Sequence, residues 1–306
     1  MNKSKNLSYV LITPAYNEEK FIEKTIQSVI SQTLHPIKWV IVSDGSTDRT
    51  DEIIKNYSSG NPWIEYLRMP EHKDRNFSAK VMCFNAGYKK VKDLDYDIIG
   101  NMDADISFEA DLLEYLVNKF MEIPELGVAG TYFVEENYSS LTDSFEGKRH
   151  VSGQCQLFRR KCFEDIGGYV PHRAGGIDWI AVTTARMKGW KTQSFNEKHY
   201  FHHRHLGTGG SNRLGSFFNY GMKDYYLGAH PLWEALRISY RFTKRPYVIG
   251  GLALLSGYLW ASIKRMKRPV SPELMKFHRW EQMEKLKLIF YGLIKEGKIE
   301  KYNLDF

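Results

Sequence analysis

The sequence predicts an α/β protein with a mostly parallel central sheet flanked by helices, followed by a helical C-terminal extension. Two observations lead to this prediction. In the first third of the 306 residues, short runs rich in β-branched residues alternate with segments that repeat apolar residues at helical spacing, which is typical of βαβ units. Beyond residue 215 helical and aromatic segments dominate. We therefore expect one domain over 1–215 and a helical, basic and apolar region over 216–306.

The first seven elements follow the βαβ pattern in order. Strands are expected at 9–13, 39–44, 64–69 and 98–102, and helices at 21–32, 50–57 and 79–91. The first helix places Ile22, Ile26 and Val29 on one face, as packing on a sheet requires. The N-terminal third therefore predicts a Rossmann-like sheet of the kind that binds nucleotides.

The rest of the first domain is less regular. The alternation loosens from about residue 128, a helix is expected from Ile177, and short strands are expected at 191–195 and 198–203. A mixture of helices and strands is therefore expected in this part.

The C-terminal region contains a long apolar run at 247–263, with basic residues on both sides. A helix of this length reaches roughly 26 Å, slightly less than a hydrocarbon core of ~30 Å. Three arrangements stay open: a helix lying on a membrane surface, a buried core or oligomer helix, and a membrane span. We favour the first, with peripheral membrane contact through 247–268, because Tyr258, Trp260 and the flanking cations suit the headgroup zone.

Composition narrows the class of protein. The net charge is +7, and residues 230–306 account for it with 15 Lys and Arg against 7 Asp and Glu. Because these charges flank an apolar run and form no solvated stripe, nucleic-acid binding is not expected. The three cysteines show no C-x-x-C spacing, and the N-terminal apolar run is too short for a signal-peptide core. We expect a cytoplasmic protein.

The stretch DLDYDIIGNMDADISF at 93–108 contains the pattern Asp-x-Asp three times. Two of the pairs, Asp93/Asp95 and Asp95/Asp97, precede the expected strand at 98–102. The third pair, Asp103/Asp105, follows it. In open α/β sheets ligands bind beyond the carboxyl ends of the strands, so the Asp103/Asp105 pair faces the binding edge. The earlier aspartates are expected to form a solvated entry turn.

The same edge receives the loops that follow the first two strands, at 14–18 and 44–48. Turn and helix-capping chemistry explains either loop alone, but three polar loops at one edge indicate a binding site. The sequence lacks G-x-G-x-x-G and P-loop motifs, so backbone amides are not expected to be the main phosphate cradle. Carboxylates that hold Mg²⁺ or Mn²⁺ would serve instead, because the cation can bridge a diphosphate leaving group.

Three segments together, ITPAYNEEKFIEKTIQSVISQT, WVIVSDGSTDRTDEI and IIGNMDADISF, resemble the family 2 glycosyltransferases of the GT-A fold. The resemblance covers about residues 8–205. It implies that Asp103 approaches the ribose and the metal, and that Asp105 binds the metal directly. It also implies that the nucleobase and ribose of a nucleotide sugar are held by Pro14, Ala15, Tyr16, Glu18 and Asp44.

The resemblance further implies a general base at the start of a helix after a glycine-containing loop, where this chain has Asp178. Many members carry Glu-Asp at this point, whereas Ile177 precedes Asp178 here. A sugar hydroxyl is a poor nucleophile, and a carboxylate opposite the leaving diphosphate can take its proton during an inverting attack. The alternative is an acidic residue that complements the helix dipole.

Three histidines, His202, His203 and His205, follow a predicted strand, and related enzymes often use a histidine here as a metal or diphosphate contact. Neighbouring residues on a strand point to opposite faces, so at most one of His202 and His203 is expected to reach the metal. We favour His203. Lys80 and Arg204 are candidate phosphate contacts.

These observations predict an inverting, metal-dependent glycosyltransferase that moves a sugar from a nucleoside-diphosphate sugar to an acceptor hydroxyl. We expect it to act in cell-surface polysaccharide or lipid-linked oligosaccharide synthesis, at the inner face of the cell membrane. Two alternatives stay open: transfer to a polyprenyl phosphate, and a catalytically silent nucleotide-sugar-binding protein.

Overall fold

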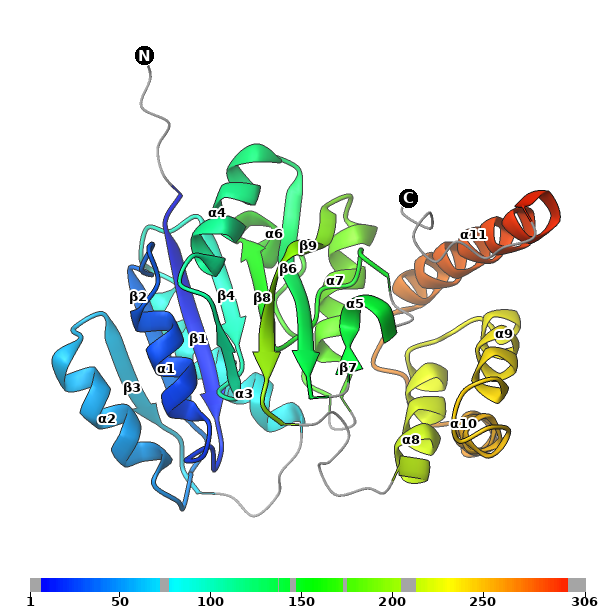
Figure 1. Cartoon of the computed structure of the whole chain (residues 1–306), viewed down its shortest axis with the longest axis horizontal. Helices are drawn as coiled ribbons and strands as arrows, with labels where there is room; N and C mark the ends of the chain where they lie inside the picture. Colours follow the sequence, from blue (N-terminus) through cyan, green and yellow to red (C-terminus); the bar gives the residue numbers. More distant parts are fainter. Residues whose placement is uncertain are drawn as a thin grey trace. The chain divides into compact units, whose positions relative to one another are not determined.

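The structure, a computed structural model, divides into two compact units, Met1–Arg204 and His205–Phe306 (Figure 1). It describes residues 7–71, 77–136, 138–143, 147–172, 175–204 and 213–296. The two units are taken in turn. The domain boundary predicted after residue 215 lies just beyond residues 205–212, which are outside the described part, and it stays a prediction.

The first unit is built on one sheet with the strand order β3-β2-β1-β4-β8-β6-β9-β5, and β7 pairs with β6. The strands are β1 (Tyr9–Ala15), β2 (Lys38–Ser43), β3 (Ile64–Arg68), β4 (Ile98–Met102), β5 (Ile106–Phe108), β6 (Leu126–Glu135), β7 (Tyr138–Ser139), β8 (Cys155–Arg159) and β9 (Lys191–His202). The strands from β3 to β4 are parallel, as the βαβ pattern predicts. β8 runs antiparallel to both β4 and β6, so the other half of the sheet is mixed.

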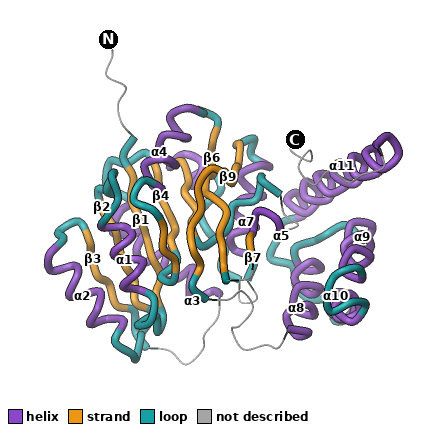
Figure 2. The backbone as a smooth tube through the Cα atoms, viewed as in Figure 1, coloured by secondary structure: helices purple, strands orange, loops and turns teal. Residues whose placement is uncertain are grey.

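Helices cover both faces of this sheet (Figure 2). They are α1 (Ile22–Ile30), α2 (Thr50–Gly60), α3 (Phe77–Val91), α4 (Leu112–Glu122), α5 (Ser140–Asp143), α6 (Arg160–Asp165) and α7 (Ile177–Met187). On β1 the side chains alternate: Leu11 packs with α1, α2 and α4 on one face, and Ile12 packs with α3, α6 and α7 on the other. These two cores confirm the predicted α/β sheet between helices.

Close backbone approach fixes α3 against this sheet. A Cβ on Gly87 of α3 would lie 2.7 Å from Cγ2 of Ile12, closer than side chains pack. The helix therefore lies directly on β1 and carries its N-terminal turn toward the end of that strand.

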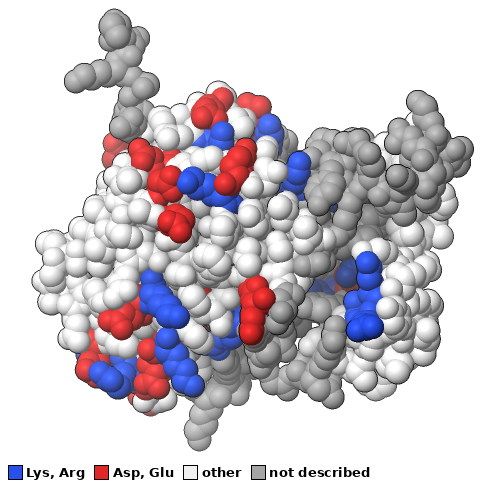
Figure 3. All heavy atoms as spheres, viewed as in Figure 1, with Lys and Arg blue, Asp and Glu red and all other residues white. Residues whose placement is uncertain are grey.

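Acidic and basic side chains lie side by side on the surface of the first unit in the face seen in Figure 3.

The strand β9 differs from the two short strands expected at 191–195 and 198–203. It is continuous over Lys191–His202, with a β-bulge opposite β6: Thr131 pairs with Phe195, and Tyr132 pairs with His199. The bulge explains the prediction of two strands, because the polar residues 196–198 interrupt the alternation of side chains there.

The second unit contains the helices α8 (Arg213–Tyr226), α9 (Pro231–Phe242), α10 (Ile249–Ile263) and α11 (Pro272–Glu296), as the predicted helical extension requires. Glycines let α10 touch α8, since a Cβ on Gly257 would lie 1.9 Å from the carbonyl oxygen of Phe218. The opposite side of α10 is exposed and apolar, with Ile249, Leu252, Leu259, Trp260 and Ile263. Among the helices of the described residues, none has the length and apolarity needed to cross a bilayer.

Candidate active site

The ends of β2, β1 and β4 meet at one edge of the sheet, because these neighbouring strands are parallel. The loops that follow β1 and β2 bind each other. The backbone N–H of Asp44 donates to the carbonyl of Ala15 at 2.8 Å, and the N–H of Thr47 donates to Oδ1 of Asn17 at 2.8 Å. The structure therefore brings the predicted nucleotide-binding loops together, with Pro14 and Ala15 in the last two positions of β1.

The turn after β2 depends on a glycine. Gly45 has φ +71°, and a Cβ there would lie 2.7 Å from the Cα of Glu71. Arg68 supports the turn by donating to the carbonyl of Ser46 at 3.1 Å. Beside it, burial and a hydrogen bond with Asp44 raise the pKa of the Cys83 thiol, which stays protonated. Asp44 is thus held between the turn and α3.

Asp103 follows β4 and forms an ion pair with Lys80 of α3. The backbone N–H of Asp103 donates to the carbonyl of Gln154 at 2.8 Å, which fixes its position beside the loop before β8. Burial raises the pKa of Asp103, and the charge of Asp105 adds to this effect. Burial lowers the pKa of Lys80, but the charge and hydrogen bond of Asp103, together with the charges of Asp178 and Asp105, outweigh this effect, and the net shift is upward. The lysine therefore stays charged.

Asp105 lies between two cationic side chains. Its Oδ2 is 3.4 Å from Nε of Arg204 and 3.6 Å from Nε2 of His202. Arg204 also pairs with Glu18, and Nδ1 of His202 is 2.7 Å from Oε1 of Glu135. Burial raises the pKa of Asp105, but His202, Arg204 and Lys80 lower it by more, so Asp105 is held as a carboxylate.

The structure turns His202, and not the favoured His203, toward Asp105. Consecutive residues of β9 face opposite sides of the strand, and His203 approaches Ser107 instead, with 2.8 Å between its Nε2 and the Ser107 Oγ. The His203 ring also stacks on Phe21, with 6.0 Å between centroids. His205 lies outside the described residues.

Asp178 lies in the first turn of α7, after Gly175 and Gly176, which both have positive φ. Gly153 faces it closely: a Cβ on Gly153 would lie 2.8 Å from the Cβ of Asp178. Nε2 of His150 is 4.0 Å from its Oδ2. The charge of Asp178 contributes to the raised pKa of Lys80, so Asp178 and Asp103 belong to one electrostatic site.

Asp103 and Asp105 carry carboxylate oxygens, which are the hard ligands that Mg²⁺ and Mn²⁺ prefer. Within the part of the chain that the structure describes, no three His, Cys, Asp or Glu side chains form a group able to hold a metal ion. Magnesium is usually bound in proteins by one or two carboxylates together with substrate phosphates and water. The carboxylates of Asp103 and Asp105 therefore fit a cation that is bound by the protein and by a diphosphate together.

Some site residues were not predicted. Glu135 ends the apolar strand β6 and is 9% exposed, and Gln154 accepts at Oε1 from the Tyr200 hydroxyl at 3.3 Å. A charged residue at the end of a buried run is a signal for Glu135, whereas nothing in the sequence indicates Gln154. At the opposite end of β4, Oδ2 of Asp97 accepts from the backbone N–H of Ser8 at 2.9 Å, so Asp97 is half-buried there and not solvated as expected.

Part of the chain is similar in sequence to known glycosyltransferases. The model of the family described as glycosyl transferase family 2 matches residues 10–144. The glycosyltransferase GlyA of Streptococcus pneumoniae serotype 4 is 32% identical over 123 residues, which are 40% of this chain and 16% of that protein. The poly-β-1,6-N-acetyl-D-glucosamine synthase of Staphylococcus aureus is 30% identical over 171 residues, 50% of this chain and 39% of the synthase. The chain thus spans well under half of these relatives.

Two solved structures share the fold. The mannosyltransferase PcManGT from Pyrobaculum calidifontis, in complex with GDP-Man and Mn²⁺, has a TM-score of 0.55 at 15% identity, over 96% of this chain and 82% of that one. Residues 1–349 of TarS from S. aureus, in complex with UDP-GlcNAc, give a TM-score of 0.53 at 15% identity, over 97% of this chain and 89% of that one. At this identity the likeness concerns the fold alone.

Proposed function

We propose that the chain is an inverting, metal-dependent glycosyltransferase, because residues 10–144 match the model of glycosyl transferase family 2. It moves a sugar from a nucleoside-diphosphate sugar to an acceptor hydroxyl. The observation that carries this proposal is the meeting of three strand-end loops with Lys80, Asp103 and Asp105 at one edge of the sheet. Lys80 pairs with Asp103 there, so a positive charge for the diphosphate lies beside a carboxylate for the metal.

The donor is proposed to lie along this edge. Its base and ribose contact the loops after β1 and β2, and Lys80 is within reach of its diphosphate. The proposed nucleotide-sugar contacts are Pro14, Ala15, Tyr16, Glu18, Asp44, Lys80 and Asp103. The two structures of similar fold carry GDP-Man and UDP-GlcNAc, which supports a nucleotide-sugar donor without identifying its base or sugar.

Asp105 and Asp103 would hold Mg²⁺ or Mn²⁺, with His202 taking the place expected for His203. When bound, the cation would neutralise the charge that develops on the departing diphosphate. Lys80 supplies a further positive charge on the same side. The protein's own part is to keep Asp105 ionised and oriented, which its neighbours Arg204 and His202 do.

Asp178 is the proposed general base. Its side chain stands in the first turn of α7, directly after Gly175 and Gly176, which both have positive φ. It takes the proton of the acceptor hydroxyl as the oxygen attacks the sugar from the side opposite the diphosphate. A side chain at position 153 would crowd Asp178, so Gly153 leaves the carboxylate the space that it occupies.

The acceptor is proposed to be a cell-surface glycan or a lipid-linked one, met at the inner face of the membrane. The exposed apolar side of α10 and the cations Lys264, Arg265 and Lys267 after it support contact with an anionic bilayer through 247–268.

Trp260→Glu should weaken cosedimentation with phosphatidylglycerol vesicles, while the exposed control Leu94→Glu should not. Equal binding by both variants would remove this part of the proposal.

The decisive experiment is a thermal-shift series with UDP- and GDP-sugars, each with and without Mn²⁺. We expect at least one nucleotide sugar to raise the melting temperature, and Mn²⁺ to increase that rise. If no donor stabilises the chain in a metal-dependent way, the proposed function is wrong.

A further inference from the structure

We propose that Lys80 and Arg204 act as exchangeable counterions of Asp103 and Asp105, and that both transfer to the donor diphosphate when the metal binds. Metal and nucleotide sugar then bind this chain cooperatively, and each binds weakly alone. The inference rests on the proposed function and concerns how its two ligands depend on each other.

Both aspartates are enclosed and accompanied by a cation. The side chain of Asp105 is 10% exposed and that of Asp103 is 22% exposed. Lys80 pairs with Asp103, while Nε of Arg204 stands 3.4 Å from Asp105. An ionised carboxylate without a partner is costly in such a place, so a cation must accompany each one in the absence of metal.

The two cations are held by side-chain ion pairs, Lys80 with Asp103 and Arg204 with Asp105 and Glu18. Nε of Arg204 is buried and makes no hydrogen bond to any described residue, so its contact with Asp105 is one of charge and not of hydrogen-bond geometry. The other end of Arg204 is fixed by Glu18. Lys80 carries its charge on a flexible stem and is 26% exposed, so it can turn to another anion without disturbing α3.

The charges of the site explain why exchange couples the two ligands. Asp103 and Asp105 are the anionic partners of Lys80 and Arg204. A divalent cation bound to both aspartates would take these partners away and stand beside the two cations. The diphosphate of the donor brings two negative charges and gives both side chains new partners. Coupling of this kind is reciprocal between the two ligands.

The test measures Mn²⁺ binding to the full chain without nucleotide, from the electron paramagnetic resonance signal of free Mn²⁺. Lys80→Met keeps the length of the stem and removes the charge. We expect it to bind Mn²⁺ at least about fivefold more tightly than the wild type, at the lower end of typical coupling factors. UDP or GDP should then strengthen Mn²⁺ binding less in this variant than in the wild type.

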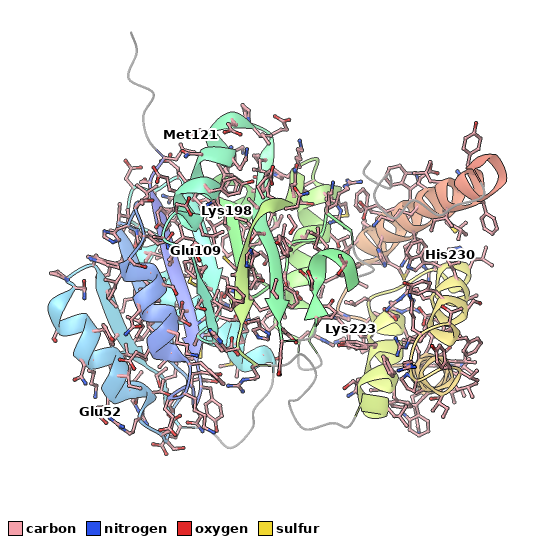
Figure 4. All side chains as sticks on the ribbon, viewed as in Figure 1. Glu52, Glu109, Met121, Lys198, Lys223 and His230 are labelled. Carbon is pink, nitrogen blue, oxygen red and sulfur yellow. The ribbon has the colours of Figure 1, made fainter. Side chains whose placement is uncertain are left out.

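Lys198→Met is the matched control. Lys198 pairs with Asp111 and is 29% exposed, close to the value for Lys80, but it lies away from the edge where β1 and β4 end (Figure 4). Its Mn²⁺ affinity should equal that of the wild type. Arg204→Gln should change in the same direction as Lys80→Met. A disturbed fold cannot imitate this result, because disorder at the carboxylates weakens metal binding.

Two failures can be told apart. If neither UDP nor GDP alters the affinity of the wild-type chain for Mn²⁺, the proposed donor binding is wrong. If nucleotide strengthens Mn²⁺ binding in the wild type, but Lys80→Met binds Mn²⁺ alone no more tightly, the exchange is overturned and the proposed function stands.

Discussion

At the scale of single residues, the site depends on how charges are compensated. Asp105 is kept ionised by His202 at the end of β9 and by Arg204 just after it. Asp103 is instead paired with Lys80 of the helix α3. Only Ala104 separates these two aspartates, yet the pKa of Asp103 is raised and that of Asp105 is lowered. We expect them to differ in function as well, with Asp105 the stronger metal ligand.

Asp105→Ala should abolish the Mn²⁺-dependent part of donor binding, because it removes the carboxylate that stays ionised. Asp95→Ala is the control: Asp95 is exposed and precedes β4, at the far end of the strand. Thermal shift with donor and Mn²⁺ measures both variants. Retained metal dependence in Asp105→Ala would contradict the assignment.

Asp178→Asn should lower the transfer rate by roughly two to four orders of magnitude, the usual contribution of a general base, and leave donor binding intact. The amide fills the same space beside Gly153 but cannot take a proton. Rates with a sugar-hydroxyl acceptor and donor affinity are the two measurements. Substantial remaining turnover would favour the alternative of a polyprenyl-phosphate acceptor, whose nucleophile is already anionic.

The sequence indicates which residues lie together where a strand end fixes their position. Asp103, Asp44 and the residues after β1 are brought together as parallel topology requires. The sequence did not indicate that His202 faces Asp105, because the face that a strand presents is set by pairing with β6 and β5, which the sequence does not reveal. Glu135 entered the site for the same reason.

At the scale of elements, the regular βαβ part was predicted strand by strand, whereas for the mixed part only a mixture of helices and strands, with a helix from Ile177, was predicted. Alternating patterns identify β1 to β4 and the helices between them, but a short apolar run such as that of β8 is buried on both faces and carries no sign of direction. Contact between helices is similarly hidden, since only the close approach itself shows why Gly257 and Gly221 are glycines.

Gly257→Val should destabilise the second unit by roughly 3 kcal/mol, because its side chain would collide with the backbone of α8 at Phe218. Urea denaturation followed by circular dichroism measures the change. Gly60→Ala is the control, since nothing lies within 4 Å of a Cβ at that position, and its stability should stay within about 0.5 kcal/mol of the wild type. A tolerated valine at 257 would contradict the packing of α10 on α8.

At the scale of the whole molecule, the chain combines a sheet between helices with a helical unit that carries its own buried carboxyl group. Glu234 of α9 is 2% exposed, and neither carboxyl oxygen hydrogen-bonds to a described residue under the geometric criteria for hydrogen bonds. Burial, and then the charge of Asp224, raise its pKa to about 8. Arg237 pairs with Asp224 and leaves the extra carboxyl protonated at neutral pH.

This raised pKa makes stability depend on pH. The folded chain holds the proton more tightly than the unfolded chain, so the stabilisation is fully present below the unfolded value of 4.5 and is lost as pH rises toward about 8. Glu234→Gln should remove that loss and stabilise the chain by on the order of 2 kcal/mol at pH 8. Melting temperatures from pH 5 to 9 measure both proteins. Parallel curves for variant and wild type would contradict the prediction.

The β-bulge of β9 has a consequence for how such a chain can vary in length. Because residues 196–198 already stand outside regular pairing, one residue more or less between Phe195 and His199 can be absorbed there without moving the end of the strand. An insertion between Tyr200 and His202 would instead turn every later side chain to the opposite face and withdraw His202 from Asp105. Evolutionary tolerance to insertions and deletions should therefore change abruptly within one strand.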